Sequence, residues 1–151
     1  LFKDTPVVGK ASTIIQCSND KLFSFIGIDL INNYPKWSPE VRELEKLTDG
    51  SIRLGTLCRQ VRIDQGNRSE STFKVTVFEP GSRICLEGVS NPYRCDYIIE
   101  PVNLSDSRVI FIFELLKLDM HIRPFEKLVR IAIQDGTERT VRNIKRLIEK
   151  K

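Results

Sequence analysis

Between residues 41 and 117 the chain consists of short segments of alternating apolar and polar residues, separated by turn signals such as Thr48-Asp49-Gly50. The expected strands are 41–47, 52–64, 69–79, 83–88, 93–100 and 108–117. Turns this short join antiparallel neighbours, because parallel strands need a crossover of about a dozen residues or more. The region therefore predicts an antiparallel meander. Its first strand stays ambiguous, since Val41, Leu44 and Leu47 recur at a spacing that also suits a helix.

Helical periodicity lies on both sides of this region. We expect a strand at 11–17 and then two short helices, with Ser18-Asn19-Asp20 as N-caps and with the helical pattern ending at Pro35. Pro124 suits a helix start, and residues 125–148 have helical period. Together these elements predict an α+β fold, in which a curved antiparallel sheet of about seven strands wraps around a long C-terminal helix.

Length and charge limit the classes of protein. The 151 residues predict a single domain over 1–151, with its core at about 10–150. The 24 Lys and Arg residues only slightly exceed the 20 Asp and Glu, and the mixed signs argue against a nucleic-acid partner. The longest uncharged apolar run, Val109–Phe113, is too short to cross a bilayer, so we expect no stable membrane insertion. The N-terminus lacks a signal-peptide pattern, and we expect a cytoplasmic protein.

The cysteines and the single histidine offer little chemistry. Cys17, Cys58, Cys85 and Cys95 include no closely spaced pair, and we expect reduced, buried thiols. His121 lies before the C-terminal helix, where a capping or surface role is expected. The sequence has no phosphate-binding glycine loop, nucleophile elbow or metal-spaced cluster. We therefore expect no metal and no cofactor, and the sequence identifies no protein partner.

Strand alternation predicts which side chains face the helix. The apolar or aromatic phase of three strands gives an expected inner wall of Phe73, Val75, Tyr93, Tyr97, Phe111 and Phe113. Such a wall suits either a packed core or the lining of an apolar cavity.

The middle of the C-terminal helix carries small residues on its sheet-facing stripe, namely Ala132, Gly136 and Thr140. A glycine inside a helix costs about 1 kcal/mol relative to alanine, so another factor must favour it. One interpretation is a close helix–sheet approach, or a kink at Gly136. The other is a space between helix and sheet that forms an apolar ligand pocket.

Arg59 is anomalous, because it shares a phase with Leu57, Val61 and Ile63 and should point inward. An unpaired buried guanidinium is very unfavourable. Arg59 would then pair, reach solvent at a pocket mouth, or meet an anionic or carbonyl-bearing ligand. Alternatively, a bulge after Gly55 shifts the phase and places Arg59 outside.

Several ordered segments resemble a known family. They are the opening helix at Ser18–Ile26, the Pro-x-Trp-x-Pro segment at Tyr34–Val41, Leu47–Gly50, Leu54–Thr56, Phe78–Ile84 and Tyr97–Pro101. In these the chain resembles the START-like SRPBCC superfamily, in its polyketide cyclase/dehydrase-like branch. The resemblance implies a helix-grip fold with a hydrophobic cavity between sheet and helix. It also implies that Trp37 belongs to a mobile lid near the entrance.

These observations favour a carrier or sensor that binds a small or mid-sized hydrophobic molecule, such as a lipid, a quinone or a polyketide-like compound. Arg59, Tyr93 and Tyr97 would orient its polar groups, and Trp37 would lie near the entrance. An alternative is a cyclase or dehydratase that acts by positioning and proton transfer. A third interpretation is a protein-interaction domain whose cavity is filled by side chains.

Overall fold

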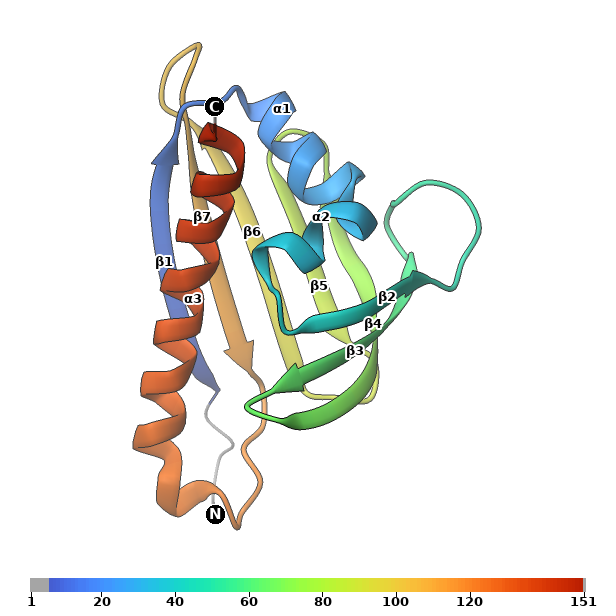
Figure 1. Ribbon diagram of the computed structural model, residues 1–151, viewed down its shortest axis with the longest axis vertical. Coiled ribbons are helices and arrows are strands. Elements are labelled where there is room, and N and C mark those ends of the chain that lie inside the picture. Colours follow the sequence, from blue (N-terminus) through green and yellow to red (C-terminus); the bar gives the residue numbers. More distant parts are fainter. Residues whose placement is uncertain (1–5, 151) are drawn as a thin grey trace.

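A curved seven-stranded antiparallel sheet holds a long helix against its concave face in the computed structural model, which describes residues 6–150 (Figure 1). The strands are β1 (Val7–Ile15), β2 (Val41–Lys46), β3 (Leu57–Asp64), β4 (Asn67–Glu79), β5 (Arg83–Gly88), β6 (Tyr93–Pro101) and β7 (Ser107–Leu115). They pair in the order β1-β7-β6-β5-β4-β3-β2. The meander and the α+β class predicted from the turns are confirmed.

The helices are α1 (Asn19–Phe23), the π-helical turn η1 (Ser24–Ile28), α2 (Leu30–Trp37), the 3-10 turn η2 (Arg123–Phe125) and α3 (Glu126–Glu149). Ser18 caps α1 as expected, because its side chain accepts a hydrogen bond from the Lys21 backbone N–H. The expected end at Pro35 is wrong: α2 continues through this proline to Trp37. Pro35 lacks a backbone N–H to donate within the helix, but this loss does not end α2.

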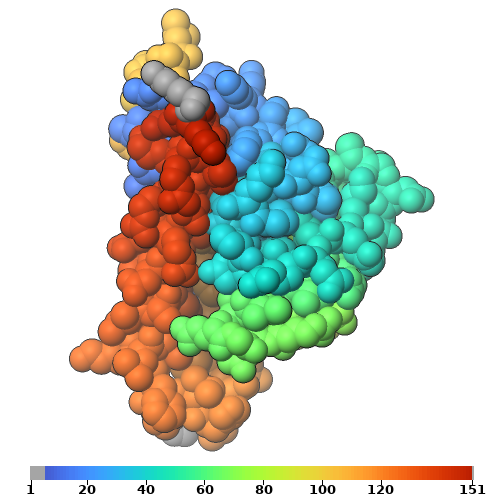
Figure 2. All heavy atoms as spheres, in the orientation of Figure 1, coloured from blue at the N-terminus to red at the C-terminus, as the bar shows by residue number. Residues whose placement is uncertain are grey.

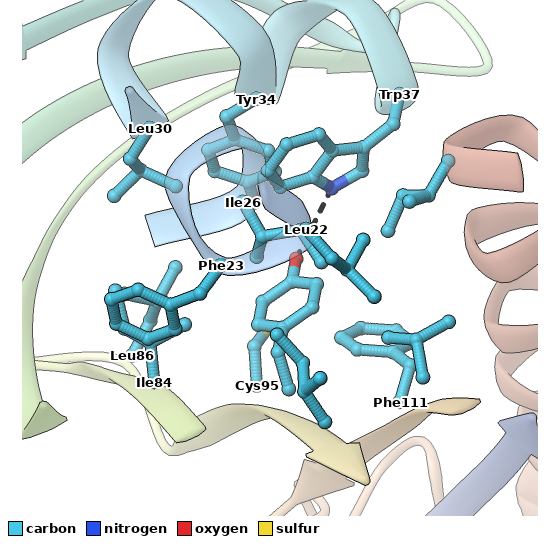
Figure 3. Packing of buried hydrophobic residues seen from close by; sticks show 14 of the residues in the cluster. Leu22, Phe23, Ile26, Leu30, Tyr34, Trp37, Ile84, Leu86, Cys95 and Phe111 are labelled. Atoms are coloured by element: carbon cyan, nitrogen blue, oxygen red, sulfur yellow. Dashed lines mark hydrogen bonds between the residues drawn. The ribbon is translucent and has the colours of Figure 1, made fainter. Parts of the chain in front are cut away.

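One half of the concave face is packed solid. Leu22, Phe23 and Ile26 of α1 and η1, with Leu30 of α2, are buried against the sheet residues Ile84, Leu86 and Tyr97. Figure 3 shows the helical side chains, Trp37 among them, pointing toward the strands that carry Ile84, Leu86 and Cys95. Apolar burial of this kind stabilises the fold by about 25 cal/mol per Å² of surface removed from water. The packed core therefore lies under the short helices.

The close approach of α3 to the sheet occurs at β1, not at Gly136. A methyl group added at Gly9 would lie 2.7 Å from the Ile133 Cγ2 atom and 3.1 Å from the Ile133 carbonyl oxygen. One added at Gly136 would have no neighbour nearer than 3.9 Å. Since α3 runs unbroken from Glu126 to Glu149, a kink at Gly136 is also absent. Of the interpretations offered for the small residues Ala132, Gly136 and Thr140, the one that remains is a space between helix and sheet.

Two irregularities change the strand phases predicted from alternation. β3 begins at Leu57 rather than at residue 52, and its pairing places Cys58 opposite Phe73. In β4 the register shifts between Val75 and Val77. As a result Phe78 packs on Phe23, with ring centroids 5.3 Å apart. Bulges of this kind invert the face of every residue that follows them, which sequence alternation cannot show.

Candidate ligand cavity

A cavity of about 600 Å³ lies between α3 and the half of the sheet that the short helices leave uncovered. Its apolar wall consists of Phe111, Phe113, Leu115, Val129, Ala132 and Ile133. In the space-filling view α3 (red to orange) and the β3–β4 hairpin (green) border it on one face of the molecule (Figure 2). This space excludes the interpretation that side chains fill the region completely.

Most of the residues expected from sequence line this cavity: Trp37, Tyr93, Tyr97, Phe111, Phe113, Ala132, Gly136 and Thr140. Phe73 and Val75 do face inward, but they are buried in the packed core and do not line the cavity. The Phe73 ring instead contacts Tyr34 edge-on, with centroids 6.2 Å apart.

Arg59 does not reach the cavity, and its predicted inward direction is corrected. Its guanidinium donates to the Glu70 carboxylate at 2.6 Å and 3.0 Å and lies 3.6 Å from Glu43. The hydrogen bonds to Glu70 are the main reason that the pKa of Arg59 is raised. Because β3 has the opposite phase to the one expected, Arg59 lies on the outer face of the sheet.

Arg62, which the sequence interpretation missed, takes the place expected for Arg59. Nη1 lies 3.4 Å from both the Tyr34 hydroxyl and the Ser38 hydroxyl, and the other two nitrogens donate to the Asp64 carboxylate at 3.1 Å and 3.2 Å. Burial alone would lower the pKa of Arg62, but Tyr34, Asp64 and Glu40 raise it above its ordinary value. The cavity therefore contains a permanent cation.

The sequence does contain a signal for Arg62, which appears when the other alternating set of β3 residues is taken to face inward. Cys58, Gln60 and Arg62 form the second phase of β3, and Gln60 is almost completely buried. An inward phase that contains two polar residues is unusual for a core strand and typical of a site.

Trp37 forms the inner wall and not a mobile lid at the entrance. It is 1% exposed, and its indole Nε1–H donates to the Tyr97 hydroxyl at 3.2 Å (Figure 3). Its backbone carbonyl accepts a hydrogen bond from Asn143 of α3 at 3.0 Å. These contacts hold the end of α2 between sheet and helix and place the ring deep in the molecule.

Comparisons with known proteins give structural likeness only, since no family model and no curated protein matches the sequence. An aromatase/cyclase from a Streptomyces species superposes with a TM-score of 0.79 at 9% identity, over 96% of this chain and 94% of its own. The chain shares the helix-grip fold of this structure. A truncated norcoclaurine synthase from Thalictrum flavum gives 0.74 at 13% identity, over 100% and 98%. A major latex-like protein from Panax ginseng gives 0.66 at 13% identity, over 95% and 99%.

In this helix-grip cavity, hydrogen-bonding groups gather mainly on β3 and β4, while α3 adds Thr137, Arg139 and Thr140 beside its apolar side chains. Gln60 Nε2 donates to the Tyr93 hydroxyl at 3.0 Å and to Ser71 at 3.3 Å, and Ser69 pairs across from Arg62. Burial is the largest cause of the raised pKa of Tyr93. Because β6, β7 and α3 contribute aromatic and aliphatic side chains, the cavity suits a molecule that is apolar on one side and polar on the other.

The phenols of the cavity stay protonated at neutral pH. Burial raises the pKa of Tyr34 and of Tyr97, with the largest effect from loss of hydration in both cases. A neutral phenol donates a hydrogen bond but does not act as a base. With Arg62 they form a set of donors suited to carbonyl or hydroxyl oxygens.

The described residues hold no group of three His, Cys, Asp or Glu side chains that could bind a metal ion. The four cysteines are free and buried, and burial raises the pKa of Cys58 to about 11 and that of Cys95 to about 12. Thiols with such pKa values are poor nucleophiles at neutral pH.

Within residues 6–150, no helix is long and apolar enough to cross a membrane.

Proposed function

We propose that this protein binds a small or mid-sized hydrophobic molecule in the cavity between sheet and α3, as a carrier or sensor. The observation that carries the proposal is the withheld side-chain volume at Gly136, next to a cavity of about 600 Å³. Ligand cavities in proteins have volumes of about 300–1,000 Å³ and are mainly apolar. Buried free cysteines suit a reducing compartment, and we therefore place this function in the cytoplasm.

The polar side of the cavity sets the orientation of the ligand. Arg62 and the neutral phenols of Tyr34 and Tyr93 are donors, so the ligand would carry a carbonyl or hydroxyl oxygen at that side. Its apolar part would contact Phe111 and Phe113. A quinone, a polyketide-like compound or a lipid with a compact polar group meets this description.

The first experiment fills the cavity from α3. Titration of the wild type with N-phenylnaphthylamine, an uncharged apolar fluorophore, should give saturable binding. Gly136→Phe should weaken it at least about tenfold, because the new ring occupies the cavity. Gly136→Ala adds one methyl group with no close neighbour and is the matched control, expected to bind like the wild type. No saturable binding by folded wild type, or equal binding by Gly136→Phe, would contradict the proposal.

The second experiment tests the two arginines of β3. With naphthoquinone as probe, Arg62→Met should weaken binding by about tenfold, since one charge-assisted hydrogen bond is lost. Arg59→Met removes the same charge from the outer face of the same strand and should leave the affinity unchanged. Equal affinities for the two variants would show that Arg62 does not orient the ligand.

A cyclase or dehydratase is the second candidate, and one contact favours it. Arg62 Nη1 lies 3.4 Å from the Tyr34 hydroxyl inside the cavity. A fixed cation beside a neutral phenol can stabilise negative charge that develops on a carbonyl oxygen. The likeness to the Streptomyces aromatase/cyclase fits such a role.

Turnover separates the two functions. If the protein is an enzyme, it should convert a poly-β-ketone mimic, and Tyr34→Phe should lose most of that activity while still binding N-phenylnaphthylamine. Absence of turnover by wild type that binds the mimic would favour the carrier or sensor. Native mass spectrometry of freshly purified protein adds a direct test, because a carrier should retain a co-purified apolar mass.

A further inference from the structure

Large apolar side chains gather on the surface where α3 begins. Met120 and Phe125 precede the helix, Phe125 at the end of η2, and Leu128 and Ile131 lie in its first two turns. These four side chains are between 52% and 79% exposed. Single exposed apolar residues are ordinary, but several within a few helical turns mark an interaction surface. We call these four residues the apolar rim.

The apolar rim adjoins the cavity. On the same helical turns Val129, Ala132 and Ile133 line the cavity. Pro92, in the turn before β6, lines it from the sheet side. This end of α3, orange in Figure 1, lies at the far end of the molecule from α1 and from the β6–β7 turn. The apolar rim is therefore continuous with the interior surface that would hold a ligand.

The charges around the apolar rim are mainly positive. Residues 117–131 contain Lys117, Arg123, Lys127 and Arg130 against Asp119 and Glu126. Glu126 lies 3.8 Å from Arg130, so one acid and one base of this segment pair within the helix, and the sequence excess of basic residues is unchanged. Exposed apolar side chains beside basic ones on one helix are typical of binding at the surface of an anionic membrane.

We propose that the first turns of α3 dock on an anionic lipid surface, with the apolar rim in the interfacial layer and the cavity opening toward it. This contact is peripheral and reversible, and it goes beyond the proposed ligand binding. A second copy of the chain fits less well, because a two-fold contact between identical faces would bring Lys127 and its neighbouring cations close to those of the partner. An anionic surface instead satisfies both the apolar and the basic side chains.

Co-sedimentation of the full chain with vesicles tests this proposal. Vesicles of equal parts phosphatidylcholine and phosphatidylglycerol should bind the protein at low salt, and phosphatidylcholine alone should bind it weakly. The double variant Leu128→Ser/Ile131→Ser should lose at least about tenfold in affinity, because its apolar contacts with the bilayer disappear. Lys127→Gln should lower the affinity for anionic vesicles about fivefold. High salt should lower the affinity of the wild type, because it screens the charges.

Leu104→Ser is the matched control. Leu104 is fully exposed in the β6–β7 turn at the other end of the molecule, and its loss should leave vesicle binding unchanged. The double variant should also bind N-phenylnaphthylamine like the wild type, since Leu128 and Ile131 do not line the cavity. No binding to anionic vesicles, or equal binding by the double variant, would overturn the proposal. A dimer that the double variant dissociates would assign the face to a second copy.

Discussion

Two glycines of this protein serve opposite purposes. Gly9 in β1 allows the backbone of α3 to come close, since any side chain there would collide with Ile133. At Gly136 in α3 an added methyl group would meet nothing nearer than the end of the Arg139 side chain, at 3.9 Å. Glycine in a helix is unfavourable because the unfolded chain gains backbone freedom. No packing contact at Gly136 offsets the low helix propensity of glycine. We expect this of a residue that leaves room for a ligand.

The two positions should respond in opposite directions to alanine. Gly136→Ala should raise the free energy of unfolding by about 0.5–1 kcal/mol, from helix propensity alone. Gly9→Ala should lower it by about 1–3 kcal/mol, because the added methyl group overlaps Ile133 and Thr137. Urea denaturation followed by circular dichroism measures both values. A destabilised Gly136→Ala would mean that the helix packs more closely there than the structure shows.

At the scale of elements, α3 covers the free edge of β1 with polar side chains. Gln134 accepts a hydrogen bond from the Lys10 N–H at 3.0 Å and donates to the Lys10 carbonyl at 2.9 Å. Farther along, Lys145 donates to the Ile14 carbonyl at 2.6 Å, and Glu149 accepts from the Gln16 N–H at 2.9 Å. Exposed strand edges invite pairing with other chains. The helix thus both holds and protects this edge.

Removal of the Gln134 amide should loosen α3 from β1. Gln134→Leu loses the two hydrogen bonds to Lys10 and the one to Glu138 at a partly hydrated site, and we expect a loss of about 1–2 kcal/mol in the free energy of unfolding. Hydrogen exchange at the Lys10 amide should also become faster, since its acceptor is gone. Asp135→Ala, an exposed change on the same helical turn, is the control for helix content. Unchanged exchange at Lys10 would argue that other contacts hold the edge.

At the scale of the whole molecule, one end is solid and the other is hollow. The short helices fill the concave face around Trp37, whereas the cavity occupies the part between α3 and the β3–β4 hairpin. Cys58 and Cys95 belong to the packed core, where burial raises the pKa of Cys58 from 9.0 to about 11 and that of Cys95 to about 12. Folding therefore favours the protonated thiols.

This burial predicts a loss of stability at alkaline pH. Below pH 9.0 the thiols are protonated in both states, so their contribution is fully present. Between pH 9.0 and about 11 the unfolded chain loses these protons first, which favours unfolding. We expect the free energy of unfolding to fall by roughly 1–3 kcal/mol over this window. Urea titrations at several pH values measure it. In Cys58→Ala the free energy of unfolding should fall less steeply with pH. The same slope as in the wild type would show that the Cys58 thiol does not cause the fall.

Local sequence patterns predicted the order and type of the main elements, though not the end of α2 or the start of β3, and the composition of one cavity wall. Turn residues and alternation predicted the meander, because short turns allow only antiparallel neighbours. The inward phase of Tyr93 and Tyr97 in β6, and of Phe111 and Phe113 in β7, was also predictable, because these strands pair without a register shift. The small stripe on α3 indicated the cavity, but it was equally compatible with a close helix–sheet approach or a helix kink.

Contacts between distant segments set what these patterns leave undetermined. The pairing of β3 with β4, which places Cys58 opposite the buried Phe73, sets the phase that turns Arg62, and not Arg59, into the cavity. The burial of Trp37 depends on Tyr97 and Asn143, which lie far away in the chain. Phe125 and Leu128 share the helical period, yet they are 55% and 64% exposed. Periodicity reports which residues share a face, but what covers that face is fixed only by tertiary packing.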